Sequence, residues 1–367
     1  MSAPAAELKD ASLLGKNLDW LLVGGLSLAF FFGFHFFVTE GADTGKIALL
    51  MYYLSLVINW PHFMLSYQLL YWDKRRELVR KPSYVWAGFV APSILILILT
   101  AGFFRRDDVI FSLMVHVMFL TVGWHYVKQV FGTIVVTSSL KSFYLSKFER
   151  WSLLASLYSL WGLSFVGGQL QNREAEFFGI RYDLLGFSLN TLYAVYGVVL
   201  LTSLTAVGAL LGRYIREGRS ISRAGWVSYV SLLAWYLPFA SHQHFFYMIP
   251  FFHSLQYLLF VSALKKNQWG AEMPAAMAAK RRRWLARHGL LYFGIAVITG
   301  LAVFWWIPSY LDRQMEGWDP DAALFWSPTI FMGVFQLFIN IHHYFIDNVV
   351  WRSDNASLRK YLFRRGS

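Results

Sequence analysis

Long apolar runs separated by short polar segments make up most of this 367-residue chain. Several runs reach the roughly 20 residues that an α-helix needs to cross a bilayer. The pattern predicts an all-α, polytopic transmembrane helix bundle that forms one integral membrane domain over residues 1–367. About ten spans are expected, with these approximate boundaries: 20–38, 47–72, 84–104, 109–137, 151–170, 185–212, 224–240, 243–264, 289–309 and 323–350.

Two of these spans are separated by very few residues. Only Ser241 to Gln243 divide 224–240 from 243–264, and Pro238 and Pro250 could instead kink one long element. The pattern leaves both interpretations open.

Charge placement gives the expected orientation. Of 33 Lys and Arg residues, 26 fall in alternate loops and the two terminal segments, 6 fall in the opposite loops, and Lys128 lies inside a span. This asymmetry follows the positive-inside rule and predicts that both termini are cytoplasmic. The segment 265–288 is expected to be a cytoplasmic basic loop with an interfacial helix.

Composition supports the membrane assignment. Hydrophobic residues make up 57% of the chain and charged residues 15%, against about 25% charged in soluble domains. The excess of basic residues lies in short loops, which argues against nucleic acid as a partner. The absence of cysteine excludes disulfides and thiolate ligands, so any metal must bind nitrogen or oxygen. A bacterial cytoplasmic (inner) membrane is the expected location.

Histidines recur at similar depths in the expected spans. Counting about 1.5 Å per residue from the loops, the predicted inner level holds His62, His125, His253 and the pair His342/His343. Ionisable groups inside a membrane are costly and usually functional. We therefore expect these imidazoles to form one metal site. Adjacent helical residues diverge by about 100°, so only one of the pair is expected to face it, with His343 preferred because Asp347 follows four residues later.

Polar residues follow each inner histidine by four positions and so share its helix face: Ser66, Gln129, Tyr257 and Asp347. Such residues can orient ligand histidines. The roles open to Asp347 are those of a ligand, a proton carrier or a partner for Lys128, and the preferred catalytic role is to orient a ligand histidine or to handle protons. Tyr126 and Gln129 are expected in the wall of the pocket. Lys128 either enters this site or extends towards the cytoplasm.

A second tier of histidines lies nine residues earlier on two spans. His116 precedes His125, and His244 precedes His253, which places the outer pair about 13.5 Å away along a helix. His116 and His244 are therefore candidates for binding a separate cofactor. Axial pairs His116/His244 and His125/His253 would suit two stacked haem b groups in an electron-transfer protein.

An imidazole site suits iron, copper or zinc more than calcium or magnesium. Non-haem iron is the preferred cofactor, because it activates dioxygen in membrane enzymes that oxidise hydrocarbons. The expected function is an oxygenase-like oxidoreductase acting on a lipophilic small molecule among membrane lipids, with an electron-donor protein as a candidate partner. The alternatives are the haem protein and a proton-coupled transporter that uses the intramembrane histidines, Asp347 and Lys128.

Short motifs carry a resemblance to known enzymes. Trp124-His125-Tyr126 and Phe252-His253-Ser254-Leu255 resemble fragments of the Brp/Blh-type membrane carotene dioxygenases, which use histidines dispersed over several spans. Membrane fatty-acid hydroxylases and desaturases are more distantly similar. Their HxxxH and HxxHH clusters are absent here, where His342-His343 and His242-Gln243-His244 stand instead. The resemblance implies a non-haem iron oxygenase.

Overall fold

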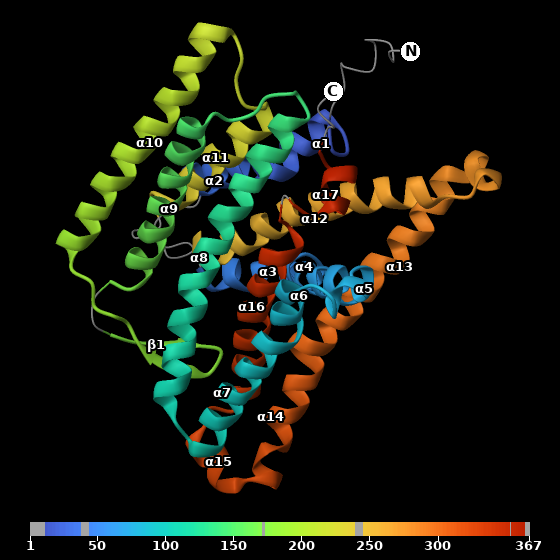
Figure 1. Ribbon diagram of the computed structural model, residues 1–367. Coiled ribbons are helices and arrows are strands. Elements are labelled where there is room, and N and C mark those ends of the chain that lie inside the picture. The colour runs from blue at the N-terminus through green and yellow to red at the C-terminus, as the bar shows by residue number, and fades with distance from the viewer. Residues whose placement is uncertain (1–11, 38–43, 171–172, 239–244, 353, 364–367) are drawn as a thin grey trace.

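The structure is a computed structural model that describes residues 12–37, 44–170, 173–238, 245–352 and 354–363. Helices account for nearly all of its regular structure, so the predicted all-α class is confirmed (Figure 1).

The first half of the chain alternates α-helices with short π-helical segments, which are labelled η. Up to residue 139 the elements are α1 (Lys16–Trp20), η2 (Leu21–Gly25), α2 (Leu26–Phe37), α3 (Thr44–Val57), α4 (Asn59–Tyr67), η3 (Gln68–Asp73), α5 (Arg75–Leu78), α6 (Pro82–Val85), η4 (Trp86–Val90), α7 (Ala91–Arg105) and α8 (Asp108–Ser139).

The second half contains the longer helices and one β-hairpin. Its elements are α9 (Lys147–Gly168), β1 (Glu174–Phe177), β2 (Ile180–Asp183), α10 (Leu189–Glu217), α11 (Arg223–Tyr236), α12 (Phe245–Glu272), the 3₁₀ turn η5 (Ala275–Lys280), α13 (Arg281–Leu301), η6 (Ala302–Trp306), α14 (Ile307–Trp318), α15 (Pro320–Phe325), α16 (Ile330–Val350) and α17 (Ala356–Tyr361).

Side-chain caps explain where several helices begin. Asp107, Ser188 and Ser222 each accept a hydrogen bond from a backbone N–H in the first turn of α8, α10 and α11. At α9, Ser146 and Glu149 form a capping box. These caps satisfy backbone donors that the helix leaves unpaired, so the polar loops between the apolar runs also set the helix ends.

Four helical stretches in the described chain are long and apolar enough to cross a membrane, which is consistent with an integral membrane protein. They are Pro82–Arg105, Asp108–Ser139, Leu189–Glu217 and Ala275–Trp318. Each overlaps one of the ten expected spans. Helix α16 also coincides with an expected span, but its 21 residues include two histidines and Asp347 and it is not among the four.

Not all of the helices that carry the histidines run side by side. In Figure 1, α12 lies across the long direction of α8 and α16. The expectation that the histidines share one depth in the membrane assumes instead that their four helices are parallel. Helix α16 packs against α4, α7 and α8, and α12 packs against α4. Crossing helices approach one another at a single point, so the imidazoles meet where the helices cross.

Two other features differ from the expected pattern. Residues 171–185 were not predicted as strands, yet β1 and β2 pair in antiparallel register through a turn in which Phe178 and Gly179 both have positive φ. That combination is the type I′ hairpin turn. The expected span 243–264 is also longer than predicted: α12 continues to Glu272, so it enters the segment 265–288, and α13 begins within that segment at Arg281.

The two spans with the uncertain division are separate helices. Helix α11 ends at Tyr236 and α12 begins at Phe245. Pro250 lies inside α12, and the hydroxyl of Ser254 donates to the Pro250 carbonyl at 2.8 Å.

Candidate metal centre

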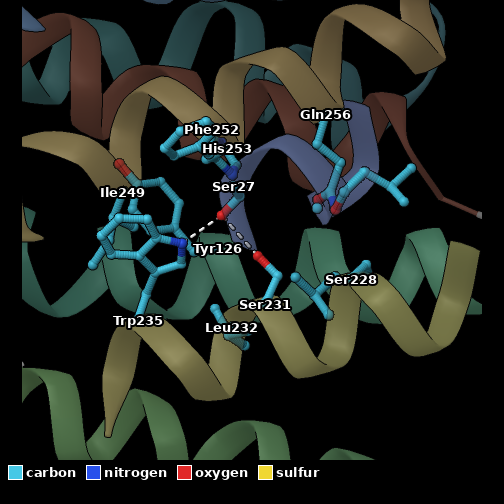
Figure 2. Close-up of a pocket in the computed structure, with 13 residues that line it drawn as sticks. Ser27, Tyr126, Ser228, Ser231, Leu232, Trp235, Ile249, Phe252, His253 and Gln256 are labelled. Atoms are coloured by element: carbon cyan, nitrogen blue, oxygen red, sulfur yellow. Dashed lines mark hydrogen bonds between the residues drawn. The ribbon is translucent and has the colours of Figure 1, made fainter. Parts of the chain in front are cut away.

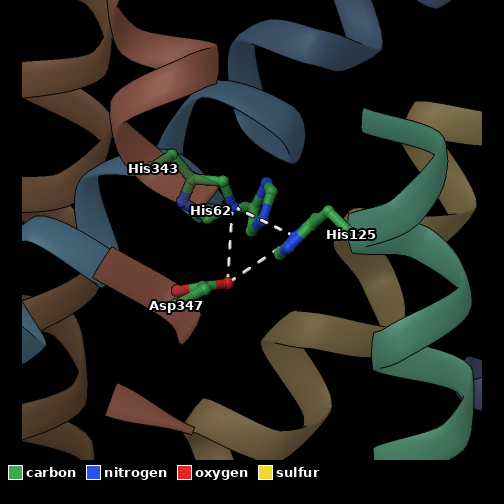
Figure 3. A group of neighbouring side chains, drawn as sticks. All are labelled: His62, His125, His343 and Asp347. Carbon is green, nitrogen blue, oxygen red and sulfur yellow. Dashed lines mark hydrogen bonds and ion pairs between the residues drawn. The ribbon is translucent and has the colours of Figure 1, made fainter. Parts of the chain in front are cut away.

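Three histidines and one aspartate from three different segments form a buried group. His62 comes from α4, His125 from α8, and His343 and Asp347 from α16; one potential ligand atom from each lies within 4.8 Å of all the others. Figure 3 shows their side chains pointing towards one another. The prediction of a buried histidine site able to hold a metal ion is confirmed to this extent.

The separations fit a single ion. His125 Nε2 lies 3.3 Å from His343 Nε2, and Asp347 Oδ2 lies 3.4 Å from His343 Nε2 and 3.7 Å from His125 Nε2. Nitrogen and oxygen ligands bind zinc-like ions at 2.0–2.2 Å, so the edges of a tetrahedral site measure about 3.3 to 3.6 Å. The three atoms are spaced as neighbouring ligands would be.

Unpaired ring nitrogens also favour a cation. The atoms His62 Nε2, His253 Nε2 and His343 Nδ1 are buried and have no hydrogen-bond partner in the described chain. Buried polar atoms are nearly always satisfied. One nitrogen of each neutral imidazole carries a lone pair, so the unpaired Nε2 atoms of His62 and His253 are available to a metal ion, whereas His343 presents its Nε2 to the group.

The fourth predicted imidazole, His253, packs against this group from α12. Its ring centroid lies 4.9 Å from that of His125 and 5.2 Å from that of His62. It is not one of the four residues whose ligand atoms all converge, so it lies at the edge of the centre.

Only one member of the adjacent pair faces the centre. Both ring nitrogens of His342 are engaged elsewhere: Nε2 donates to the Ala87 carbonyl at 2.8 Å, and the Tyr67 hydroxyl donates to Nδ1 at 2.7 Å. The inclusion of His342 among the metal ligands is therefore corrected. The helical twist of about 100° per residue turns it away from His343.

The position of Asp347 suits the ligand role, one of the roles considered for it. Its Oδ1 lies 2.7 Å from the Ser66 hydroxyl and 3.3 Å from the Tyr257 hydroxyl, while Oδ2 faces the histidines. The Ser66 and Tyr257 hydroxyls also contact each other, so their two hydrogens are shared among these three contacts. Two hydroxyls thus hold one carboxylate oxygen and leave the other beside the ring nitrogens, which makes Asp347 a candidate ligand.

The ring of His62 is oriented by a residue that the spacing argument missed. The Ser254 hydroxyl lies 3.2 Å from His62 Nδ1 and 2.8 Å from Asn59 Oδ1, and its one hydrogen is shared between Asn59 Oδ1 and the Pro250 carbonyl. Such a partner holds a ligand histidine in place. Ser254 follows His253 directly, and no periodicity in the sequence marks it.

The two pocket-wall candidates both contact His253. The ring of Tyr126 packs on His253 with centroids 4.1 Å apart, and the Gln129 amide donates to the His253 carbonyl at 2.9 Å. Tyr126 and His253 line a small pocket of about 50 Å³ with Ser27, Ser231 and Trp235, which are joined by hydrogen bonds (Figure 2).

A larger cavity of about 540 Å³ adjoins the centre, and it is lined by His125, Asp347, Gln129 and Lys128. The same cavity reaches Arg150 at the start of α9.

His116, the described member of the outer tier, is not part of the centre. His116 Nδ1 donates to the Ser112 carbonyl at 2.7 Å, and its ring packs against Tyr182 of the β-hairpin. His244, its proposed partner, lies outside the described residues.

Comparison with protein-family models, curated proteins and solved structures finds no match, so the geometry alone supports the functional conclusion.

Proposed function

We propose that this chain is an integral membrane oxidoreductase, of the non-haem iron oxygenase type, that acts on a lipophilic substrate. The observation that carries the proposal is the close approach of His125, His343 and Asp347. Two histidines and one carboxylate around open positions are the ligand set typical of non-haem Fe(II) oxygenases. His62 would be the additional ligand, and His253 would line the centre. An iron ion held there would supply the site for dioxygen.

The surroundings suit such chemistry. The side chains of the centre are almost fully buried; His343 is 0% exposed and His62 1%. The adjoining cavity falls within the range of about 300–1,000 Å³ typical of small-molecule sites. The resemblance of Trp124-His125-Tyr126 to carotene dioxygenase fragments is in keeping with this function.

A haem protein is less well supported. The rings of His125 and His253, one of the pairs considered for haem, pack edge to face with centroids 4.9 Å apart. This is direct ring contact, and it leaves no space for a porphyrin between the two rings. A compact ion fits the same group of side chains.

Elemental analysis of the detergent-purified protein tests the proposal. We expect about one iron per chain in the wild type and at least a tenfold loss in His125→Ala and His343→Ala, because each removes a ligand. His288→Ala is the matched control, since His288 bonds to the Trp284 carbonyl far from the centre. Zinc in place of iron, or equal iron in all variants, would refute the oxygenase assignment.

A further inference from the structure

The 540 Å³ cavity has a charged wall that the metal centre does not use. It lies between α8, α12 and the end of α16, and the segment after α16 closes one side with Leu358, Leu362 and Phe363. His125 and Asp347 form the part of its wall that belongs to the metal centre. Lys128 and Arg150 line the same cavity.

These two cations share one aromatic ring. Lys128 Nζ and Arg150 Cζ each lie 5.8 Å from the centroid of Phe131. Neither forms an ion pair with a carboxylate in the described chain, whereas the third cation in the wall, Arg352, pairs with Asp354 at 3.2 Å. Of the two carboxylates in the wall, Asp347 is held by Ser66 and Tyr257 and faces the histidines. The cavity therefore has an excess of positive charge at Lys128 and Arg150.

The rest of the wall is largely apolar. Aromatic and aliphatic side chains line it, namely Trp124, Phe131, Val135, Val136, Phe260, Trp351, Leu358, Leu362 and Phe363. Such a lining favours hydrocarbon, and charged groups beside hydrocarbon favour a ligand that carries the opposite charge.

We propose that this cavity binds a single-chain amphiphile whose anionic head group, a carboxylate or a phosphate, pairs with Lys128 and Arg150. Lys128 lies three residues after His125 on the same face of α8. Phe131 lies six residues after His125, which is a distance of about 9 Å along the helix axis. The hydrocarbon within about 10 Å of the head group therefore lies beside the metal centre. This last step rests on the proposed oxygenase function; binding of the amphiphile does not.

Equilibrium binding of radiolabelled oleate to the purified full-length protein, treated with a chelator, tests the head-group assignment. We expect wild-type protein to bind oleate at least tenfold more tightly than oleyl alcohol, because a charge-assisted pair is worth about tenfold or more in affinity. The double variant Lys128→Gln/Arg150→Gln should lose this preference and bind both compounds equally. Lys128→Arg should retain it, and so should Lys141→Gln, which removes an exposed lysine outside the cavity wall.

Further arms identify the head group. If unlabelled oleyl phosphate displaces radiolabelled oleate as strongly as unlabelled oleate does, the site accepts either anion. If only unlabelled oleate displaces it, the site is specific for a carboxylate. Competition by inorganic phosphate equal to that by oleyl phosphate overturns the amphiphile assignment. Equal binding of oleate and oleyl alcohol by wild type, or unchanged oleate affinity in a double variant that elutes and melts like wild type, also overturns it.

The two proposals can fail separately. Protein that contains no iron as purified, before any chelator is added, and that still shows the Lys128/Arg150-dependent preference for oleate would refute the oxygenase assignment and support the head-group site. Protein that contains iron as purified but lacks that preference would do the reverse.

Discussion

At the scale of single residues, His342 and His343 show how one step along a helix separates two roles. Both are buried, at 1% and 0% exposure. His342 joins α16 to Tyr67 and to the Ala87 carbonyl, whereas His343 keeps one ring nitrogen unpaired and the other beside His125 and Asp347. Both ring nitrogens of His342 are therefore engaged in hydrogen bonds, whereas the Nε2 atom of His343 is available to a metal ion.

Substitution of the two residues should therefore have different effects. His342→Ala leaves the Ala87 carbonyl and the Tyr67 hydroxyl without their partner, which should lower the free energy of unfolding by about 1–3 kcal/mol with metal content kept. His343→Ala should abolish metal binding. Thermal melting and elemental analysis of both variants check this expectation. Loss of metal from His342→Ala as complete as from His343→Ala would show that the two roles are not separate.

At the scale of elements, the end of η3 is joined to α12 and α13 through a buried ion pair. Lys265, 2% exposed, pairs with Asp73, and the Tyr292 hydroxyl donates to the same carboxylate at 3.2 Å. The ammonium group also lies 4.4 Å from the centroid of the Tyr292 ring. These contacts hold α12 beside η3, which continues α4, the helix that carries His62.

Breaking this pair should cost more than breaking a surface pair. Lys265→Met leaves the partly exposed Asp73 without its counter-charge and should destabilise the protein by about 1–3 kcal/mol. Lys74→Gln, which removes the less buried Lys74–Glu77 contact at 3.0 Å, should cost less than about 1 kcal/mol. Melting temperatures in detergent measure both effects. The double variant Lys265→Met/Asp73→Leu should recover most of the loss; no recovery would argue against an unpaired charge as the cause.

At the scale of the whole molecule, orientation in the membrane is a proposal based on the distribution of basic residues. It places the turn between α8 and α9 in the cytoplasm and the β-hairpin outside. The chain has no cysteine, so a single introduced thiol can report its own side without background.

Labelling with a membrane-impermeant maleimide tests the orientation. In spheroplasts, Asp183→Cys and Asp321→Cys, both at exposed positions, should react, while Lys141→Cys should react only after the membrane is opened. The opposite pattern would invert the topology. Reaction of all three in sealed spheroplasts would contradict an odd number of spans between residues 141 and 321, or the transmembrane assignment itself.

The sequence alone predicted the helical class, since apolar runs of this length and caps such as Ser146 act locally. It also singled out His62, His125 and His343 for a common centre, because an ionisable group in an apolar run has a high energetic cost whatever the fold. The tertiary structure decided what depends on crossing helices: the exclusion of His342, the approach of Asp347 Oδ2 to the ring nitrogens, and the Ser254 contact to His62. Periodicity sets the face of one helix, but the angle and point at which two helices meet depend on packing between distant segments.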